Sequence, residues 1–209
     1  GRPGPVVIAL PEDMLTEAAL VADALPFAVT ETHPGPAPLA ELQQRLAAAR
    51  RPVVILGGSR WSARAAQQFR VFAEAFALPV FCSFRRQMLF DHSHPCYGGD
   101  LGLGANPRLL ARIRNADLVL LVGGRLSEVP SQGYTLLGIP TPEQSLVHVY
   151  ADADEFGKLY RAAQSIHATP QAFAEAVGTL RPATPPAWQA ETEAAHADYL
   201  RWSDPAPIH

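Results

Sequence analysis

The chain has 209 residues, a formal net charge of −3 and hydrophobic residues at 48% of its positions. This length is enough for one sizeable core with tails, and this hydrophobic content excludes a disordered chain. The charge gives no basis for binding nucleic acid or an anionic membrane, and no apolar run reaches the roughly 18 residues of a membrane-spanning helix. With no basic-then-apolar leader and only Cys82 and Cys96, we expect a cytoplasmic protein with reduced thiols.

The first part of the chain is predicted to hold a short strand ahead of a linker. Pro5–Leu10 is an apolar run typical of a buried strand, and a short helix around Met14–Val21 is expected to follow. Pro26–Pro38 then contains four prolines and a glycine. Because proline lacks the N–H group that a helix or sheet requires, we expect a linker and a domain boundary there.

Strands and helices are predicted to alternate after this linker. Pro38–Arg50 has leucines at helical spacing and is followed by Pro52–Arg60, which runs Pro-Val-Val-Ile-Leu-Gly-Gly-Ser-Arg. Its four consecutive branched residues, Val53–Leu56, leave no polar face, so this strand should be buried on both sides in a parallel sheet. A helix from Ser62 to about Ala77 and a strand at Pro79–Cys82 are expected next.

The middle of the chain has a second strong strand between two loop-rich stretches. Ser83–Gly104 has little periodicity and four glycines near its end, so a loop is expected. Asn106 is the expected N-cap of a helix over Pro107–Asn115. Asp117–Arg125 is then a buried strand that ends in Gly-Gly-Arg, and a long loop continues to Gln144, of a length that is usually functional.

The last part of the chain continues the alternation. Leu146–Tyr150 is a predicted strand, and Asp152 with Glu155 forms a capping pair for a short helix. A short strand and a helix are expected at Ser165–Ala168 and Pro170–Leu180. After a proline-rich break, five residues keep helical spacing and suggest a packing stripe for a neighbouring domain or subunit: Trp188, Thr192, Ala195, Tyr199 and Trp202.

This alternation predicts an α/β fold, a three-layer parallel (Rossmann-like) sheet with helices on both faces. Ligands of such sheets bind at the carboxyl ends of the strands. Three predicted strands end in small residues, Gly57-Gly58, Ser83 and Gly123-Gly124. We therefore expect these residues to share one rim and to border a crevice, where glycines and a helix N-terminus can approach a phosphate.

Four segments in order resemble one enzyme family. They are Gly1–Asp13, Pro52–Ser59, Ala116–Leu126 (Ala-Asp-Leu-Val-Leu-Leu-Val-Gly-Gly-Arg-Leu) and Val147–Lys158 (Val-His-Val-Tyr-Ala-Asp-Ala-Asp-Glu-Phe-Gly-Lys). They resemble the central domain of the thiamine-diphosphate-dependent enzymes of the acetolactate synthase and 2-oxo acid decarboxylase group, the first being the last strand of that family's pyrimidine-binding domain.

The resemblance implies a parent enzyme, a transferase or lyase, that uses thiamine diphosphate and Mg²⁺ to join or cleave C–C bonds of 2-oxo acids. The family's cofactor-activating Glu lies upstream and its Gly-Asp-Gly metal motif lies downstream. We therefore expect no catalytic and no metal-binding residue in this chain and no turnover by it alone. The implied partners are the pyrimidine- and pyrophosphate-binding domains of the same chain, in a homo-oligomeric parent.

The same resemblance implies a division of the chain. Residues 1–25 would be the tail of the pyrimidine-binding domain and 26–37 a linker. Residues 38–182 would form the central domain, and 183–209 a linker and helix toward the pyrophosphate-binding domain.

The resemblance also implies a nucleotide site, because some members hold FAD or ADP in the central domain. By position, the candidate cofactor-binding residues are Gly57, Gly58, Ser59, Ser83, Gly123, Gly124, Arg125 and Asp152. One departure from the family concerns the ribose: Tyr150 stands where many members have an acidic residue. Each candidate also has a structural reading, since the glycines suit tight turns, Asp152 suits a helix cap, and Arg125 could pair with Glu128 or Glu155. Arg60, Arg85 and Arg86 are solvated surface or phosphate contacts.

Two alternatives remain open from the sequence. The chain could be a purely structural domain whose crevice holds nothing, as Tyr150 suggests. It could also be a free-standing NAD-dependent enzyme, although neither strong strand is followed by Gly-x-Gly-x-x-Gly.

Overall fold

The protein is built around one six-stranded sheet, in which all strands run parallel in the order β3-β2-β1-β4-β5-β6. The computed structural model describes residues 4–205. The strands are β1 (Pro52–Leu56), β2 (Val80–Ser83), β3 (Tyr97–Leu101), β4 (Leu118–Val122), β5 (Ser145–Tyr150) and β6 (Gln164–His167). This order places the two strongest apolar strands, β1 and β4, side by side in the centre and confirms the predicted fold class.

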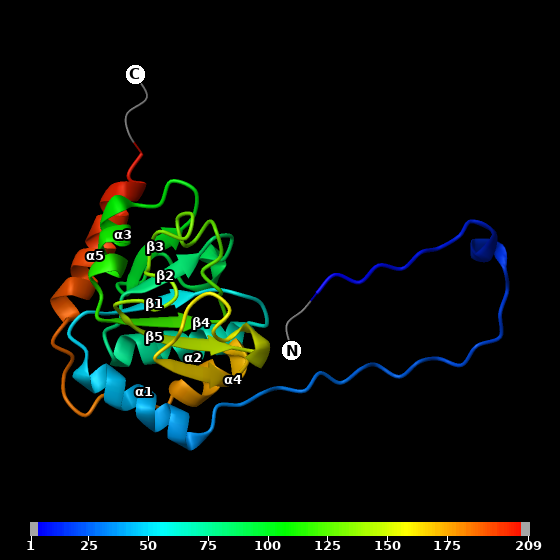
Figure 1. Cartoon of the computed structure of the whole chain (residues 1–209), viewed down its shortest axis with the longest axis horizontal. Coiled ribbons are helices and arrows are strands. Elements are labelled where there is room, and N and C mark those ends of the chain that lie inside the picture. The colour runs from blue at the N-terminus through cyan, green and yellow to red at the C-terminus, as the bar shows by residue number, and fades with distance from the viewer. Residues whose placement is uncertain (1–3, 206–209) are drawn as a thin grey trace.

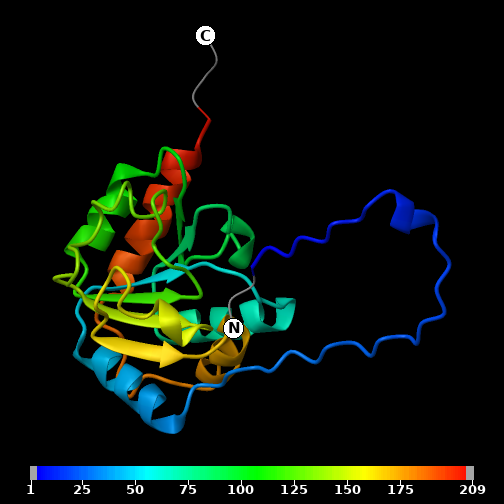
Figure 2. The ribbon, with the colours of Figure 1, turned by 45° about the vertical axis from the view of Figure 1, so that its right-hand side comes forward.

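Helices cover both faces of the sheet (Figures 1 and 2). The helices are α1 (Pro36–Ala48), α2 (Ala63–Ala75), α3 (Pro107–Asn115), α4 (Pro170–Val177) and α5 (Gln189–Ser203), with 3-10 turns η1 (Asp13–Thr16), η2 (Gln87–Leu89) and η3 (Ala153–Glu155). Buried side chains of α1, α2 and α4 form the core on one face, and α3 with the loop after β4 forms the core on the other. Among the described residues, no helix has the length and apolarity to cross a membrane.

The central strands divide their side chains between the two cores. Val54 and Leu56 of β1 join the α2 side, whereas Val53 and Ile55 join the α3 side. All residues of β1 and β4 are buried. A strand covered on both faces needs an apolar residue at every position, which is why these strands appear in the sequence as continuous apolar runs.

The helices begin where short polar side chains cap them. The side chain of Ser62 accepts from the N–H of Ala65, and that of Asn106 accepts from the N–H of Arg108 ahead of Pro107. Thr169 caps α4 in the same way. The prediction that Asn106 and Pro107 open a helix is therefore confirmed.

Strand β3 lies in the stretch for which a loop was predicted. Its sequence, Tyr-Gly-Gly-Asp-Leu, does not predict a strand, because the two glycines interrupt the apolar pattern. Packing explains the first of these glycines: a Cβ on Gly98 would lie 2.3 Å from a ring atom of Phe81 on β2. The loop prediction for Ser83–Gly104 is thus wrong over Tyr97–Leu101.

The N-terminal segment differs most from its prediction. Pro5–Leu10 forms no strand, and Val6 and Val7 are 85% and 91% exposed. The helix expected around Met14–Val21 is reduced to η1. Figures 1 and 2 show this segment running away from the body, so no neighbouring surface is available to bury its apolar residues. Residues 1–3 and 206–209, which begin the first and end the last expected segment, lie outside the described residues.

Helix α5 packs against the body of the domain, next to β3 and α3. Trp188, Thr192 and Ala195 of the expected packing stripe are buried, and Tyr199 meets Tyr97 edge to face with ring centroids 4.7 Å apart. Trp202 remains 56% exposed. Most residues of the stripe therefore pack against other parts of this chain.

Candidate functional site

A polar crevice of about 500 Å³ lies at the carboxyl ends of β1, β2, β4 and β5. Its lining is formed by Gly58, Ser59, Arg60, Ser83, Phe84, Arg85, Arg86, Gly123, Gly124, Arg125, Ser127, Tyr150, Ala151 and Pro170. All of these follow or end a strand or begin a helix, as expected for a ligand site of a parallel sheet. The volume lies within the roughly 300–1,000 Å³ of small-molecule sites.

Most of the predicted site residues meet at this crevice. Six of them line it: Gly58, Ser59, Ser83, Gly123, Gly124 and Arg125. Gly57 lies directly behind the lining, between Ser83 and Gly124. Asp152 is placed outside it, where its side chain accepts from the N–H of Asp154 at 3.2 Å and caps η3. The acidic residue that the sequence offered for a ribose hydroxyl is thus not part of the crevice wall.

The four glycines pack the turns after β1 and β4 against each other. Gly58 and Gly123 have φ angles of +73° and +71°, and a Cβ on Gly58 would lie 1.7 Å from the carbonyl oxygen of Gly123. A Cβ on Gly57 would lie 3.0 Å from the Cα of Gly124. Only glycine fits this backbone contact, which brings both turns to one rim. Internal packing alone therefore accounts for these glycines.

Four arginines give the crevice its positive charge. Arg60 is paired with Glu31, and Arg125 lies 3.9 Å from Glu155. Within residues 4–205, neither Arg85 nor Arg86 forms an ion pair, and the guanidinium of Arg85 lies over the Phe84 ring at 5.1 Å. Nη1 of Arg86 donates to the carbonyl of Arg85 at 3.1 Å, and both guanidinium groups keep further N–H donors that can bind an anion. These arginines line the crevice, which is the position that the phosphate-contact interpretation requires.

Glu31 ties the N-terminal segment to the crevice rim. Its carboxylate accepts hydrogen bonds from the hydroxyl of Thr169 and from Arg60, and the N–H of Thr169 donates to the carbonyl of Thr32 at 3.0 Å. The hydrogen bond from Thr169, together with that from Arg60, lowers the pKa of Glu31 below its ordinary value. No local pattern in the sequence indicates this contact, because its partners are far apart in the chain.

His148 holds one of the glycine turns of the crevice through a hydrogen bond. It is buried in β5, and its Nε2 lies 2.9 Å from the carbonyl oxygen of Gly124. A carbonyl can only accept, so Nε2 carries the hydrogen and donates it. Burial lowers the pKa of His148, which keeps the ring neutral. The sequence placed His148 in the predicted strand Leu146–Tyr150, but only the structure shows its contact with the Gly124 turn.

Metal and thiol chemistry find no support at this rim. In the described part of the chain, no group of three or more His, Cys, Asp or Glu side chains could hold a metal ion. Burial raises the pKa of Cys82 to about 12 and that of Cys96 to about 11, so both are thiols at neutral pH. The crevice can bind and orient an anion, but it presents no nucleophile with a partner base.

Residues 39–177 match the family described as thiamine pyrophosphate enzyme, central domain. The chain belongs to this family. The match runs from α1 to the end of α4 and so includes the whole sheet and the crevice.

Two curated proteins are similar in sequence to most of this chain. The chain is 31% identical over 170 residues to the acetolactate synthase isozyme 3 large subunit of Escherichia coli (strain K12), which covers 78% of the chain and 29% of that protein. It is 30% identical over 156 residues to a probable sulfoacetaldehyde acetyltransferase of Rhizobium meliloti (strain 1021), covering 73% of the chain and 26% of that protein. The chain therefore spans less than a third of these relatives.

A solved structure has a similar fold. The benzoylformate decarboxylase of Polynucleobacter necessarius superposes on 85% of the chain, and on 33% of its own, with a TM-score of 0.60 and 19% identity. This likeness shows the central-domain fold.

Proposed function

We propose that the chain is the central domain of a thiamine-diphosphate-dependent enzyme that acts on 2-oxo acids, by carboligation as in acetolactate synthase or by decarboxylation. The chain would be flanked by pyrimidine- and pyrophosphate-binding domains that hold thiamine diphosphate and Mg²⁺. We further propose a cytoplasmic homo-oligomer as the whole enzyme. Support comes from the family match and from relatives that are more than three times as long as the matched part.

The residues that line the crevice do not fit Mg²⁺. Mg²⁺ takes oxygen ligands, chiefly carboxylates, but the crevice is lined by arginines, glycines and serines. We therefore assign catalysis to the flanking domains and no catalytic residue to this one. The proposed division of the chain stays as the resemblance implies it: residues 1–25, 26–37, 38–182 and 183–209.

We propose that the crevice binds the phosphates of ADP or of FAD. The observation that carries this proposal is the pair of arginines, Arg85 and Arg86, which line the same cavity of about 500 Å³ as the glycine turns. Phosphate oxygens match both backbone N–H groups and guanidinium forks. The adenosine part has less support, because Tyr150 stands in the wall and Asp152 does not.

Titration calorimetry with ADP tests this proposal, alongside the visible absorbance of any flavin carried through purification. Arg85→Gln should weaken ADP binding about tenfold, since a hydrogen bond to a charged group contributes about 1.5–3 kcal/mol. Arg114→Gln is the matched control, because Arg114 is exposed at the end of α3 and does not line the crevice. Equal ADP affinity for the two variants would contradict the proposal.

A purely structural role is the second candidate, and the packing of the glycines favours it. Because a Cβ on Gly58 would clash with Gly123, packing alone requires glycine in this turn, whether or not a ligand binds. If purified protein carries no nucleotide and neither ADP nor FAD binds at millimolar concentration, this candidate replaces the binding proposal.

A further inference from the structure

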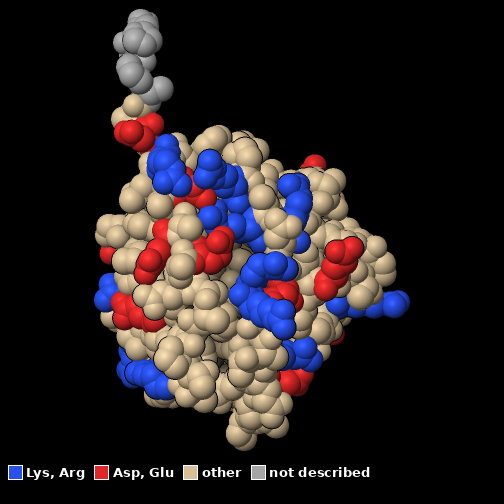
Figure 3. Space-filling model, turned by 90° about the vertical axis from the view of Figure 1, so that its left-hand side faces the viewer, with Lys and Arg blue, Asp and Glu red and all other residues tan. Residues whose placement is uncertain are grey.

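A second cavity, of about 480 Å³, lies between α3 and α5 near the amino ends of β1 and β2. It is lined by Arg51, Pro52, Val53, Pro79, Arg108, Ala111, Arg112, Asn115, Trp188, Glu191, Thr192 and Asp198. Figure 3 views this side of the molecule, where arginine and carboxylate side chains gather. The cavity lies at the sheet edge opposite to the crevice and shares no lining residue with it.

The floor and one wall of this cavity are apolar. Pro52 and Pro79 stand at the starts of β1 and β2, where proline offers no N–H group. The Trp188 ring forms part of the wall, and its Nε1 is already used by the carbonyl of Phe76 at 3.0 Å. The hydroxyl of Thr192 likewise donates to the carbonyl of Ala77 at 2.6 Å. These groups therefore offer a ligand contact area and no further hydrogen-bond donor.

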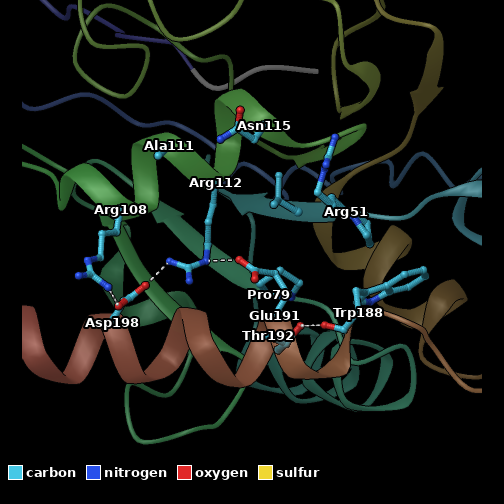
Figure 4. Close-up of a pocket in the computed structure, with 12 residues that line it drawn as sticks. Arg51, Pro79, Arg108, Ala111, Arg112, Asn115, Trp188, Glu191, Thr192 and Asp198 are labelled. Atoms are coloured by element: carbon cyan, nitrogen blue, oxygen red, sulfur yellow. Dashed lines mark hydrogen bonds and ion pairs between the residues drawn. The ribbon is translucent and has the colours of Figure 1, made fainter.

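The carboxylates of the cavity already have partners. Arg112 lies between the two helices and bridges them, with Nε 2.6 Å from Glu191 and Nη1 2.5 Å from Asp198 (Figure 4). Asp198 is 5% exposed and also accepts from Arg108 at 2.8 Å and from Arg201. Both carboxylates thus have guanidinium partners.

Unused donors remain on the arginines. A guanidinium has five N–H groups, and in residues 4–205 the Nη2 of Arg112 makes no hydrogen bond. Arg108 uses only Nη1, and the side chain of Arg51 has no ion pair within the described part of the chain. Arg51, Arg108 and Arg112 outnumber the two carboxylates. The cavity is therefore rich in donors, positive in net charge and apolar on one side.

We infer that this cavity is a binding site for a small amphipathic anion. The apolar body of the ligand packs on Trp188, Pro52 and Pro79. Its carboxylate or phosphate accepts hydrogen bonds from Arg112, and Arg51 adds positive charge at the cavity wall. The volume is large enough to admit benzoate or phenyl phosphate. Because the ligand lies between α3 and α5, it also stabilises the packing of α5. The inference is independent of the proposed nucleotide crevice.

Titration calorimetry on the 209-residue chain with four probes tests the inference. Benzoate or phenyl phosphate should bind saturably, and comparing the two tells whether the site prefers a carboxylate or a phosphate. Benzamide lacks the charge and acetate lacks the apolar body, so each should bind at least about tenfold more weakly. Equal affinity for benzamide and benzoate, or no saturable binding of either aromatic anion up to solubility, would overturn the inference.

Variants locate the site. Arg51→Gln removes a guanidinium without touching the Asp198 ion pairs, and Ala111→Leu fills the cavity with a good helix former. Each should weaken binding of the aromatic anion about tenfold or more, whereas Arg114→Gln and the crevice variant Arg85→Gln should leave it unchanged. ADP binding should respond in the opposite way, to Arg85→Gln and not to Ala111→Leu. If Arg85→Gln abolishes anion binding and the cavity variants do not, the ligand lies in the crevice and the inference is wrong.

Discussion

The two edges of the sheet use different chemistry to build a cavity. At the carboxyl edge, glycine turns after β1 and β4 pack together and loop arginines surround them. At the amino edge, prolines begin the strands, and the polar groups come from side chains of two helices. The carboxyl edge therefore depends on backbone conformation, whereas the amino edge depends on ion pairs between helices. Four variants test whether the two edges differ in this way.

The largest effect is expected for Gly58→Ala. The new Cβ would lie 1.7 Å from the carbonyl oxygen of Gly123, so the turns after β1 and β4 must separate. We expect the free energy of unfolding to fall by more than about 4 kcal/mol in urea denaturation. Gly104→Ala is the matched control, because Gly104 has φ +72° but nothing within 4 Å of a Cβ. It should cost only about 1 kcal/mol, and equal losses in the two variants would contradict the packing argument.

Asp198→Asn tests the ion pairs of the amino edge. Burial opposes ionisation of Asp198, but hydrogen bonds from Arg112, Arg201 and Arg108 outweigh it, and the net effect is a lowered pKa. The variant should lower the free energy of unfolding by about 2–3 kcal/mol at pH 7.

The lowered pKa of Asp198 also fixes how its contribution to the free energy of unfolding changes with pH. A lowered carboxyl pKa contributes stability that is complete above the unfolded pKa, near 4, and is lost as the pH falls through the folded value. The difference between the protein and Asp198→Asn should therefore shrink on acidification. Glu193→Gln, on the exposed side of α5, should show little change at any pH. A constant difference down to the lowest pH at which the fold persists would argue against the ion pairs.

His148→Phe tests the support of the carboxyl edge. Removing the donor leaves the carbonyl of Gly124 without its buried partner, which should cost about 1–2 kcal/mol. Because burial lowers the pKa of His148, the folded state favours the neutral ring, and stability is lost as the pH falls below the unfolded pKa of about 6.5. The variant should lack this decline in thermal denaturation between pH 7.5 and 5.5. His33→Gln, an exposed position, should keep it.

The smallest effect is expected for Glu31→Gln. This change weakens the pairing with Arg60 at a partly exposed site, which should cost at most about 1 kcal/mol. Local opening should still be visible as faster hydrogen exchange of the Thr169 amide, which donates to Thr32. An unchanged exchange rate would mean that Glu31 does not hold the segment at the crevice rim.

The sequence predicted the central sheet because its strongest signals are local. The continuous apolar residues of β1 and β4 and the Asn106-Pro107 helix start each report on their immediate surroundings. Strand β3 was not predicted, because its Gly98 is required by close packing against the Phe81 ring of another strand. The apolar residues of Pro5–Leu10 predicted burial, but the described chain provides no surface for them.

The candidate site was predictable where it depends on strand ends and not where it depends on distant contacts. Gly58, Ser83 and Gly123 meet at one rim because parallel strands end together. The contacts of Glu31 with Thr169, and of Asp198 with Arg112, join residues more than 80 positions apart. Such pairs leave no periodic pattern in a single sequence, so the anion cavity between α3 and α5 could be found only in the folded chain.

Co-crystallisation with ADP shows whether the carboxyl edge is the phosphate-binding edge of this central domain. We expect phosphate density in the crevice, within hydrogen-bonding distance of Arg85 or Arg86 and facing the Gly58 and Gly123 turns. Phosphate density only in the cavity between α3 and α5, or an ADP-free crevice at saturating ADP, would contradict it.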